Sequence, residues 1–184
     1  MPSERSCKSL VDRRVVAVVP AAGKGLRMGG SVPKQFLALG GEPLVVHSLR
    51  VLQSSPCIDQ IILAVPQADL DYCLNDLAVR YGFSKITKVV AGGRERQDSV
   101  RQALEHVPDE TEIVVVHDAV RPFLTEKMVA EVVAAARRHG GAIIAQAAST
   151  ALPPRVKIMP PAVAASGLPV TATQWDPCST GFQV

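Results

Sequence analysis

Short apolar runs alternate with amphipathic stretches over the first 145 residues of the chain. The runs are rich in β-branched residues and short enough to be strands, so we predict five buried strands. They lie at 15–19, 61–65, 86–90, 113–116 and 142–145. Between them, apolar residues recur at helical spacing, which predicts amphipathic helices at 43–52, 68–81, around 100–107 and at 126–139.

Two helix ends carry clear boundary signals. Thr125 can cap the start of the 126–139 helix, Gly140 and Gly141 can end it, and Gly82 can end the 68–81 helix. Strands that are apolar on both faces and alternate with helices predict an α/β fold, with a mostly parallel sheet covered by helices on both faces. Ligands bind such sheets at the carboxyl ends of the strands. The loops after the first, third and fourth strands are therefore the places to look for chemistry.

Composition supports one folded domain. The chain has 184 residues and is 47% hydrophobic but only 4% aromatic, which predicts an aliphatic core and excludes a disordered chain. A net charge of +3 argues against a nucleic-acid or membrane-surface partner. The four cysteines are scattered, which excludes a disulfide scaffold, and the N-terminal extension 1–13 has no apolar stretch typical of a secretory signal. We therefore expect a cytoplasmic protein.

The charge distribution changes near residue 150. Of the 37 charged residues, only Arg155, Lys157 and Asp176 lie in 151–184, a segment that also holds six of the 14 prolines. We therefore expect a domain at 14–146, incomplete at its C-terminal side, and an atypical tail at 147–184 outside that fold. Two origins for this tail stay open: a reading-frame artefact or disrupted gene, which the sudden loss of charge favours, and a true divergent ending.

The loop after the first strand, PAAGKGLRMGG, contains four glycines and is followed by Pro33-Lys34-Gln35. Glycines let backbone N–H groups approach an anion, and Lys24, Arg27 and Lys34 place three cations within eleven residues, which suits a polyphosphate. The spacing matches neither the P-loop nor the dinucleotide fingerprint. A flexible turn with solvated charges is an equal alternative on the glycines alone.

The loops after the third and fourth strands add polar candidates. In AGGRERQDS, Gly92 and Gly93 permit close backbone approach, and Ser99 can hold a phosphate or hydroxyl at a helix N-terminus; an ordinary turn capped by Asp98 or Ser99 is the alternative. In HDAVRP, Asp118 suits a Mg²⁺ ligand, and a structural ion pair with Arg121 is its alternative. His117 is expected to be packed or hydrogen-bonded rather than catalytic.

Together the segments AAGKGLRMG with PKQF, AGGRERQDSV and VVVHDAVRPF resemble the sugar-phosphate cytidylyltransferases, and among them the 2-C-methyl-D-erythritol 4-phosphate cytidylyltransferase family of the non-mevalonate isoprenoid pathway. The resemblance extends from about residue 14 to about residue 145. It implies a Rossmann-like nucleotidyltransferase fold, a homodimer, and transfer of CMP from CTP to methylerythritol phosphate with release of pyrophosphate. Ribitol 5-phosphate as acceptor, or an inactive remnant that at most binds nucleotide, are the alternatives.

The resemblance also implies roles for individual residues. Arg27 and Lys34 would stabilise the transition state, and Asp118 would bind Mg²⁺. The remaining candidates would contact CTP: the phosphates through Ala21, Ala22, Gly23 and Gly25, and the cytosine and ribose through Gly93 and Ser99. A role for Arg94 does not follow from the resemblance. The family's later segments, including its dimerisation arm and acceptor site, are not identifiable after residue 146.

Overall fold

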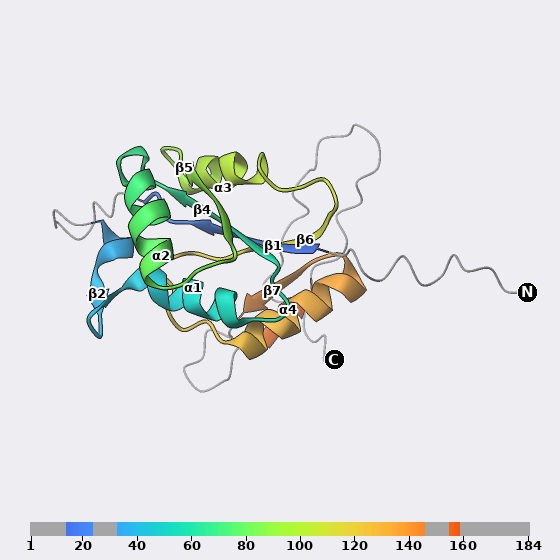
Figure 1. The fold of residues 1–184 in the computed structure, drawn as a ribbon. Helices are drawn as coiled ribbons and strands as arrows, with labels where there is room; N and C mark the ends of the chain where they lie inside the picture. The colour runs from blue at the N-terminus through green and yellow to red at the C-terminus, as the bar shows by residue number, and fades with distance from the viewer. Residues whose placement is uncertain (1–13, 24–32, 146–154, 159–184) are drawn as a thin grey trace, which may run out of the picture.

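The computed structural model describes residues 14–23, 33–145 and 155–158 of the chain. Its centre is a parallel sheet of four strands in the order β5-β4-β1-β6 (Figure 1). The strands are β1 (Arg14–Pro20), β4 (Gln60–Val65), β5 (Ile86–Ala91) and β6 (Thr111–Val116). Each lies within two residues of a predicted apolar run, and the predicted α/β fold class is confirmed.

Strand β1 occupies the middle of the sheet and is buried on both faces. It pairs with β4 along one edge and with β6 along the other, and no residue from Val15 to Val19 is more than 1% exposed. Alternate side chains enter separate cores: Val15, Ala17 and Val19 on one face, Val16 and Val18 on the other. This two-sided burial explains why the strand is a continuous apolar run.

Helices cover both faces of the sheet, as predicted. Helices α1 (Leu44–Ser54) and α4 (Glu126–His139) pack on one face, and α3 (Arg96–Leu104) lies on the other (Figure 1). The boundaries of α4 are those the sequence predicts: the Thr125 hydroxyl accepts a hydrogen bond from the Met128 amide at 3.2 Å, and Gly140 adopts a left-handed φ of 79°. None of the helices in the described segments is both long and apolar enough to cross a bilayer.

The predicted helix at 68–81 forms with an irregular winding. A 3-10 turn, η3 (Gln67–Asp69), precedes the π-helical η4 (Tyr72–Leu77) and a last α turn, α2 (Ala78–Arg80). Wider π winding rotates the side chains away from regular helical spacing. In this segment Leu74 is 49% exposed, whereas Cys73 and Leu77 are buried. Burial raises the pKa of the Cys73 thiol to about 12.

The fifth predicted strand forms but does not join the parallel sheet. Strand β7 (Ala142–Ala145) pairs antiparallel with β8 (Arg155–Ile158), a strand that the pattern did not predict. Expecting β7 in the parallel sheet was wrong because β8 supplies its backbone partners instead. Pro153 and Pro154 precede β8 and so do not interrupt it.

A groove of about 450 Å³ separates β6 from β7 and is bounded by α4. Apolar side chains at its edges are partly exposed: Val116 at 42%, Ile143 at 46% and Ile144 at 37%. Within the described part of the chain, β6 is an edge strand of the parallel sheet.

The segment between β1 and α1 brings further residues toward the end of β1. It contains the 3-10 turn η2 (Lys34–Phe36) and a short antiparallel ribbon of β2 (Ala38–Leu39) and β3 (Glu42–Pro43). The Leu44 amide donates to the Leu37 carbonyl at 2.9 Å, which ties η2 to the start of α1.

Replacing Leu49 of α1 tests the larger core. Its side chain is fully buried between α1 and the sheet, so Leu49→Ala should lower the free energy of unfolding by about 2–5 kcal/mol. The matched control is Val79→Ala, because Val79 is 74% exposed and should change stability by less than about 0.5 kcal/mol. Urea unfolding measures both, and equal losses would contradict the assigned packing.

Candidate active site

The carboxyl ends of β1, β5 and β6 meet η2 around one cleft of about 610 Å³. Every predicted site residue within the described segments lines this cleft. They are Ala21, Ala22, Gly23, Lys34, Gly93, Ser99 and Asp118. Gly25 and Arg27, the other two predicted site residues, lie outside the described residues. Segments far apart in sequence are thus brought together, as expected for a parallel sheet.

The loop after β1 has a more specific geometry than the glycines alone indicate. The Ala21 amide donates to the Ala64 carbonyl at 2.7 Å and is used by the sheet. Among the described residues of this loop, Ala22 and Gly23 are therefore the ones whose backbone amides can be offered to a phosphate. Ala21 is buried behind them, and the predicted contact at Gly25 lies outside the described residues.

The glycines after β5 are required by the chain's own packing. A Cβ atom on Gly92 would lie 2.2 Å from the Ala22 Cβ and 2.8 Å from the Ser99 Oγ. One on Gly93 would lie 2.2 Å from the Asp98 Cβ. At Gly92 the predicted close approach is made to Ala22 of the β1 loop, so the β5 loop packs against that loop, and at Gly93 it is made to Asp98 of α3.

Ser99 and its neighbours organise the start of α3. The Ser99 hydroxyl accepts a hydrogen bond from the Gly93 amide at 3.1 Å and donates to the Glu95 carbonyl at 3.2 Å. The N-cap is Glu95, in a capping box with Asp98, so the alternative in which Asp98 or Ser99 caps the helix is wrong. Ser99 is 2% exposed and holds the loop in shape at the wall of the cleft.

Lys34 is a cation without a partner in the described part of the chain. It begins η2, whose turn is closed by the Leu37 amide donating to the Lys34 carbonyl at 3.1 Å. Phe36 anchors this turn: it packs against the core and meets Tyr72 edge to face at 5.5 Å between ring centroids. The anchored turn leaves the ammonium group of Lys34 available to an anion in the cleft.

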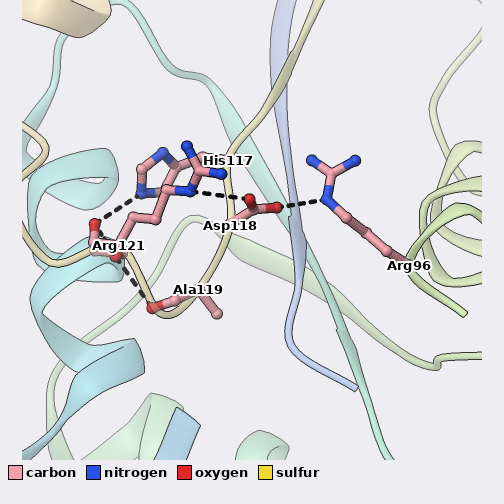
Figure 2. Close-up of polar contacts among 6 residues, drawn as sticks. Arg96, His117, Asp118, Ala119 and Arg121 are labelled. Carbon is pink, nitrogen blue, oxygen red and sulfur yellow. Dashed lines mark hydrogen bonds and ion pairs between the residues drawn. The ribbon is translucent and has the colours of Figure 1, made fainter. Parts of the chain in front are cut away.

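Asp118 lies between two arginines. Figure 2 shows its carboxylate accepting from Arg96 Nε at 2.7 Å on one oxygen, and Arg121 Nε lies 3.0 Å from the other oxygen. The side chain of Asp118 is only 19% exposed, whereas Arg96 and Arg121 are 61% and 74% exposed. The predicted ion pair with Arg121 is present. Arg96 adds a second ion pair, which connects the loop after β6 to the start of α3.

Hydrogen bonds from α1 and from His117 hold the loop that carries Asp118. The buried Ser48 hydroxyl of α1 lies 3.2 Å from the Ala119 carbonyl and 3.1 Å from the Arg121 carbonyl, which both can accept its proton. The His117 ring nitrogen lies 3.2 Å from the same Arg121 carbonyl (Figure 2). Burial lowers the pKa of His117 below its ordinary value of 6.5. His117 is hydrogen-bonded, as predicted.

The residues of the cleft fit a magnesium ion that is shared with a nucleotide. The described residues contain no group of three or more His, Cys, Asp or Glu side chains arranged to hold a metal. Mg²⁺ needs only one or two carboxylates when substrate phosphates and water complete its shell. Asp118 supplies one such carboxylate, and each of its oxygens keeps a further acceptor position beside its arginine.

The sequence did not single out Arg96 or Gln35 as residues of the site. Arg96 lines the cleft and forms an ion pair with Asp118, and Gln35 lines the cleft and is buried next to Lys34. Both lie inside segments singled out for glycines or for a neighbouring charge. Their position in those loops was the only available signal, because a lone arginine or glutamine has no characteristic spacing.

A parallel sheet covered on both faces, with two glycine-containing loops, a lysine unpaired among the described residues and a carboxylate at its carboxyl edge, defines a protein of the Rossmann-like nucleotidyltransferase fold. The model of the family "IspD: 2-C-methyl-D-erythritol 4-phosphate cytidylyltransferase" matches residues 15–157. The chain belongs to this family. The match runs through β8 and so extends beyond residue 145, where the motif resemblance ended.

Individual relatives agree with the family. A 2-C-methyl-D-erythritol 4-phosphate cytidylyltransferase of Syntrophus aciditrophicus is 51% identical over 132 residues, covering 72% of this chain and 56% of the relative. One from Geobacter metallireducens is 42% identical over 134 residues, covering 71% and 58%. The crystal structure of 4-diphosphocytidyl-2C-methyl-D-erythritol synthase from Anaerococcus prevotii superposes with a TM-score of 0.62 at 27% identity, over 76% of this chain and 57% of that one. The chain thus spans little more than half the length of these relatives.

Replacing Gly92 tests the contact between the two loops. In Gly92→Ala the new methyl group would overlap Ala22, so the loops must separate and stability should fall by about 1–3 kcal/mol. Gly23→Ala is the matched control, because a Cβ there meets no atom of the described residues within 4 Å. Urea unfolding should show a loss only in the Gly92 variant. A Gly92 variant as stable as the control would contradict this packing.

Proposed function

We propose that the chain binds CTP in the cleft with Mg²⁺ and serves transfer of CMP to 2-C-methyl-D-erythritol 4-phosphate. The observation that carries the proposal is the gathering of the described candidate residues around one cleft, which Asp118 and Lys34 both line, with Lys34 unpaired among the described residues. The matched family and the names of the relatives support the nucleotide and the acceptor. A homodimer in the cytoplasm remains our expectation for the working protein.

The proposed chemistry explains why the site needs cations. An oxygen of the acceptor phosphate forms a bond to the α-phosphorus of CTP, while the bond from that phosphorus to the β-phosphate oxygen breaks and pyrophosphate leaves. Two anions must approach each other, so catalysis depends on charge neutralisation and alignment. A bound Mg²⁺ would neutralise phosphate charge in this reaction.

The other roles in the proposed reaction fall to residues of the chain itself. The Ala22 and Gly23 amides can donate to phosphate oxygens, and the Lys34 ammonium can neutralise charge that develops at the α-phosphorus. Asp118 would hold the metal, with Arg96 and Arg121 fixing the direction of its carboxylate. The β5 loop, which Gly93 and Ser99 shape, would form the wall against cytosine and ribose.

Replacing the two predicted transition-state cations tests the proposal directly. Lys34→Ala and Arg27→Ala should each lower turnover by on the order of 10²–10³, because each removes a charge used in the transition state. Pyrophosphate release is measured with CTP, Mg²⁺ and methylerythritol phosphate, and it should require the acceptor. Lys88→Ala, at an exposed lysine of β5, is the control and should keep the unsubstituted rate.

Unchanged turnover in both cleft variants would refute the assignment. A chain that binds CTP but releases no pyrophosphate would support the nucleotide-binding remnant instead.

Asp118 can be tested through the metal dependence of binding. In the unsubstituted chain, Mg²⁺ should tighten CTP binding, and Asp118→Asn should remove most of that gain because an amide is a weaker ligand for a hard cation. Calorimetric titration with CTP, with and without Mg²⁺, gives the ratio of the two affinities. Asp109→Asn, at an exposed site outside the cleft, should leave the ratio unchanged. The same ratio in Asp118→Asn and in the unsubstituted chain would exclude Asp118 as the ligand.

A further inference from the structure

The side chain of Gln35 is buried at the cleft, and none of the described residues gives its amide nitrogen a hydrogen-bond partner. Gln35 is 1% exposed, and its Nε2 is unpaired within the described segments. In the described part of the chain, two other buried side-chain atoms are also unpaired, on Gln102 and Thr111, but neither residue lines the cleft. The one such donor at the cleft therefore lies beside the lysine assigned to catalysis.

An unpaired buried donor is unfavourable for the free protein. Leaving a buried polar group unsatisfied costs its desolvation without a compensating hydrogen bond, and each such group calls for an explanation such as contact with a ligand. Leu or Met would fill the same space without this cost. The position of Gln35 is also well defined, because Phe36 packs into the core and the Phe36 amide donates to the Pro33 carbonyl at 2.9 Å.

We propose that the Gln35 amide donates a hydrogen bond to a phosphate oxygen of the bound nucleotide. Three features of the same cleft favour a phosphate over the base. The neighbouring Lys34 is a cation without a partner in the described residues, Ala22 and Gly23 line the same cleft, and a neutral N–H donor forms stronger hydrogen bonds to an anionic oxygen. The inference rests on the proposed function and makes Gln35 a binding residue that acts together with Lys34.

The test combines stability with binding in the variant Gln35→Met. Met keeps the length of the side chain but has no donor, so thermal unfolding of the free protein should occur at the same or a higher temperature. Affinity for CTP and for pyrophosphate, measured by calorimetry, should fall about 10-fold to 100-fold, since a hydrogen bond to a charged group is lost. Affinity for cytidine should not change, because cytidine has no phosphate.

Two further variants sharpen the result. Gln35→Glu should weaken CTP and pyrophosphate binding more than Gln35→Met does, because it places a negative charge against the phosphates. Gln67→Met, at an exposed glutamine of η3 that does not line the cleft, is the control and should alter neither stability nor affinity.

The outcomes separate the inference from the proposed function. A Gln35→Met protein that unfolds at a lower temperature and binds CTP and pyrophosphate normally would show a structural role and overturn the inference alone. Weaker cytidine binding, or Gln35→Glu binding CTP as tightly as the unsubstituted chain, would overturn the phosphate assignment. An unsubstituted chain that binds neither CTP nor pyrophosphate would overturn the proposed function, and the inference with it.

Discussion

The two-sided burial of β1 is the constraint on which the rest of this structure depends. A strand hydrogen-bonded along both edges and covered on both faces has no freedom to shift, since a slip of one residue would exchange its two core faces. Its carboxyl end therefore has a definite position. The β1 loop leaves the sheet there, beside the ends of β5 and β6. Every candidate residue described in the cleft depends on that position, either directly or through a neighbouring strand.

The cleft is shaped mainly by contacts that the chain makes with itself. Gly92 lets the β5 loop touch Ala22, and Ser99 closes the same loop through its hydroxyl. Ser48 reaches from α1 to the loop after β6. Glycines and serines, whose residue types alone would suggest contact with a ligand, thus also form the walls of the cleft. In the proposed function, such a wall would let a few amides and one lysine meet a polyphosphate without further reorganisation.

Ion pairs also orient the carboxylate of Asp118 in the cleft. A carboxylate that is only 19% exposed and lies between two arginines is held in one orientation before any ligand arrives. Because both arginines are largely exposed, the energy of each pair is modest. The pairs can therefore rearrange when phosphates or a cation enter. Gln35 illustrates the opposite case, a buried group that the protein leaves unsatisfied at the same cleft.

The sequence by itself determined the five apolar strands, three of the helices and most of the candidate residues, because each depends on local periodicity or on a short motif. Val15–Val19 needs only its apolar run, and α4 needs only Thr125, its apolar face and Gly140. Tertiary structure decided what depends on partners distant in the chain. It paired β7 with β8 instead of the parallel sheet, left Leu74 exposed in the π-helical segment, and engaged the Ala21 amide with Ala64. It also placed Arg96 on Asp118 and buried the Gln35 amide. Hydrogen-bond partners and burial are properties of the folded chain, and no spacing along the sequence records them.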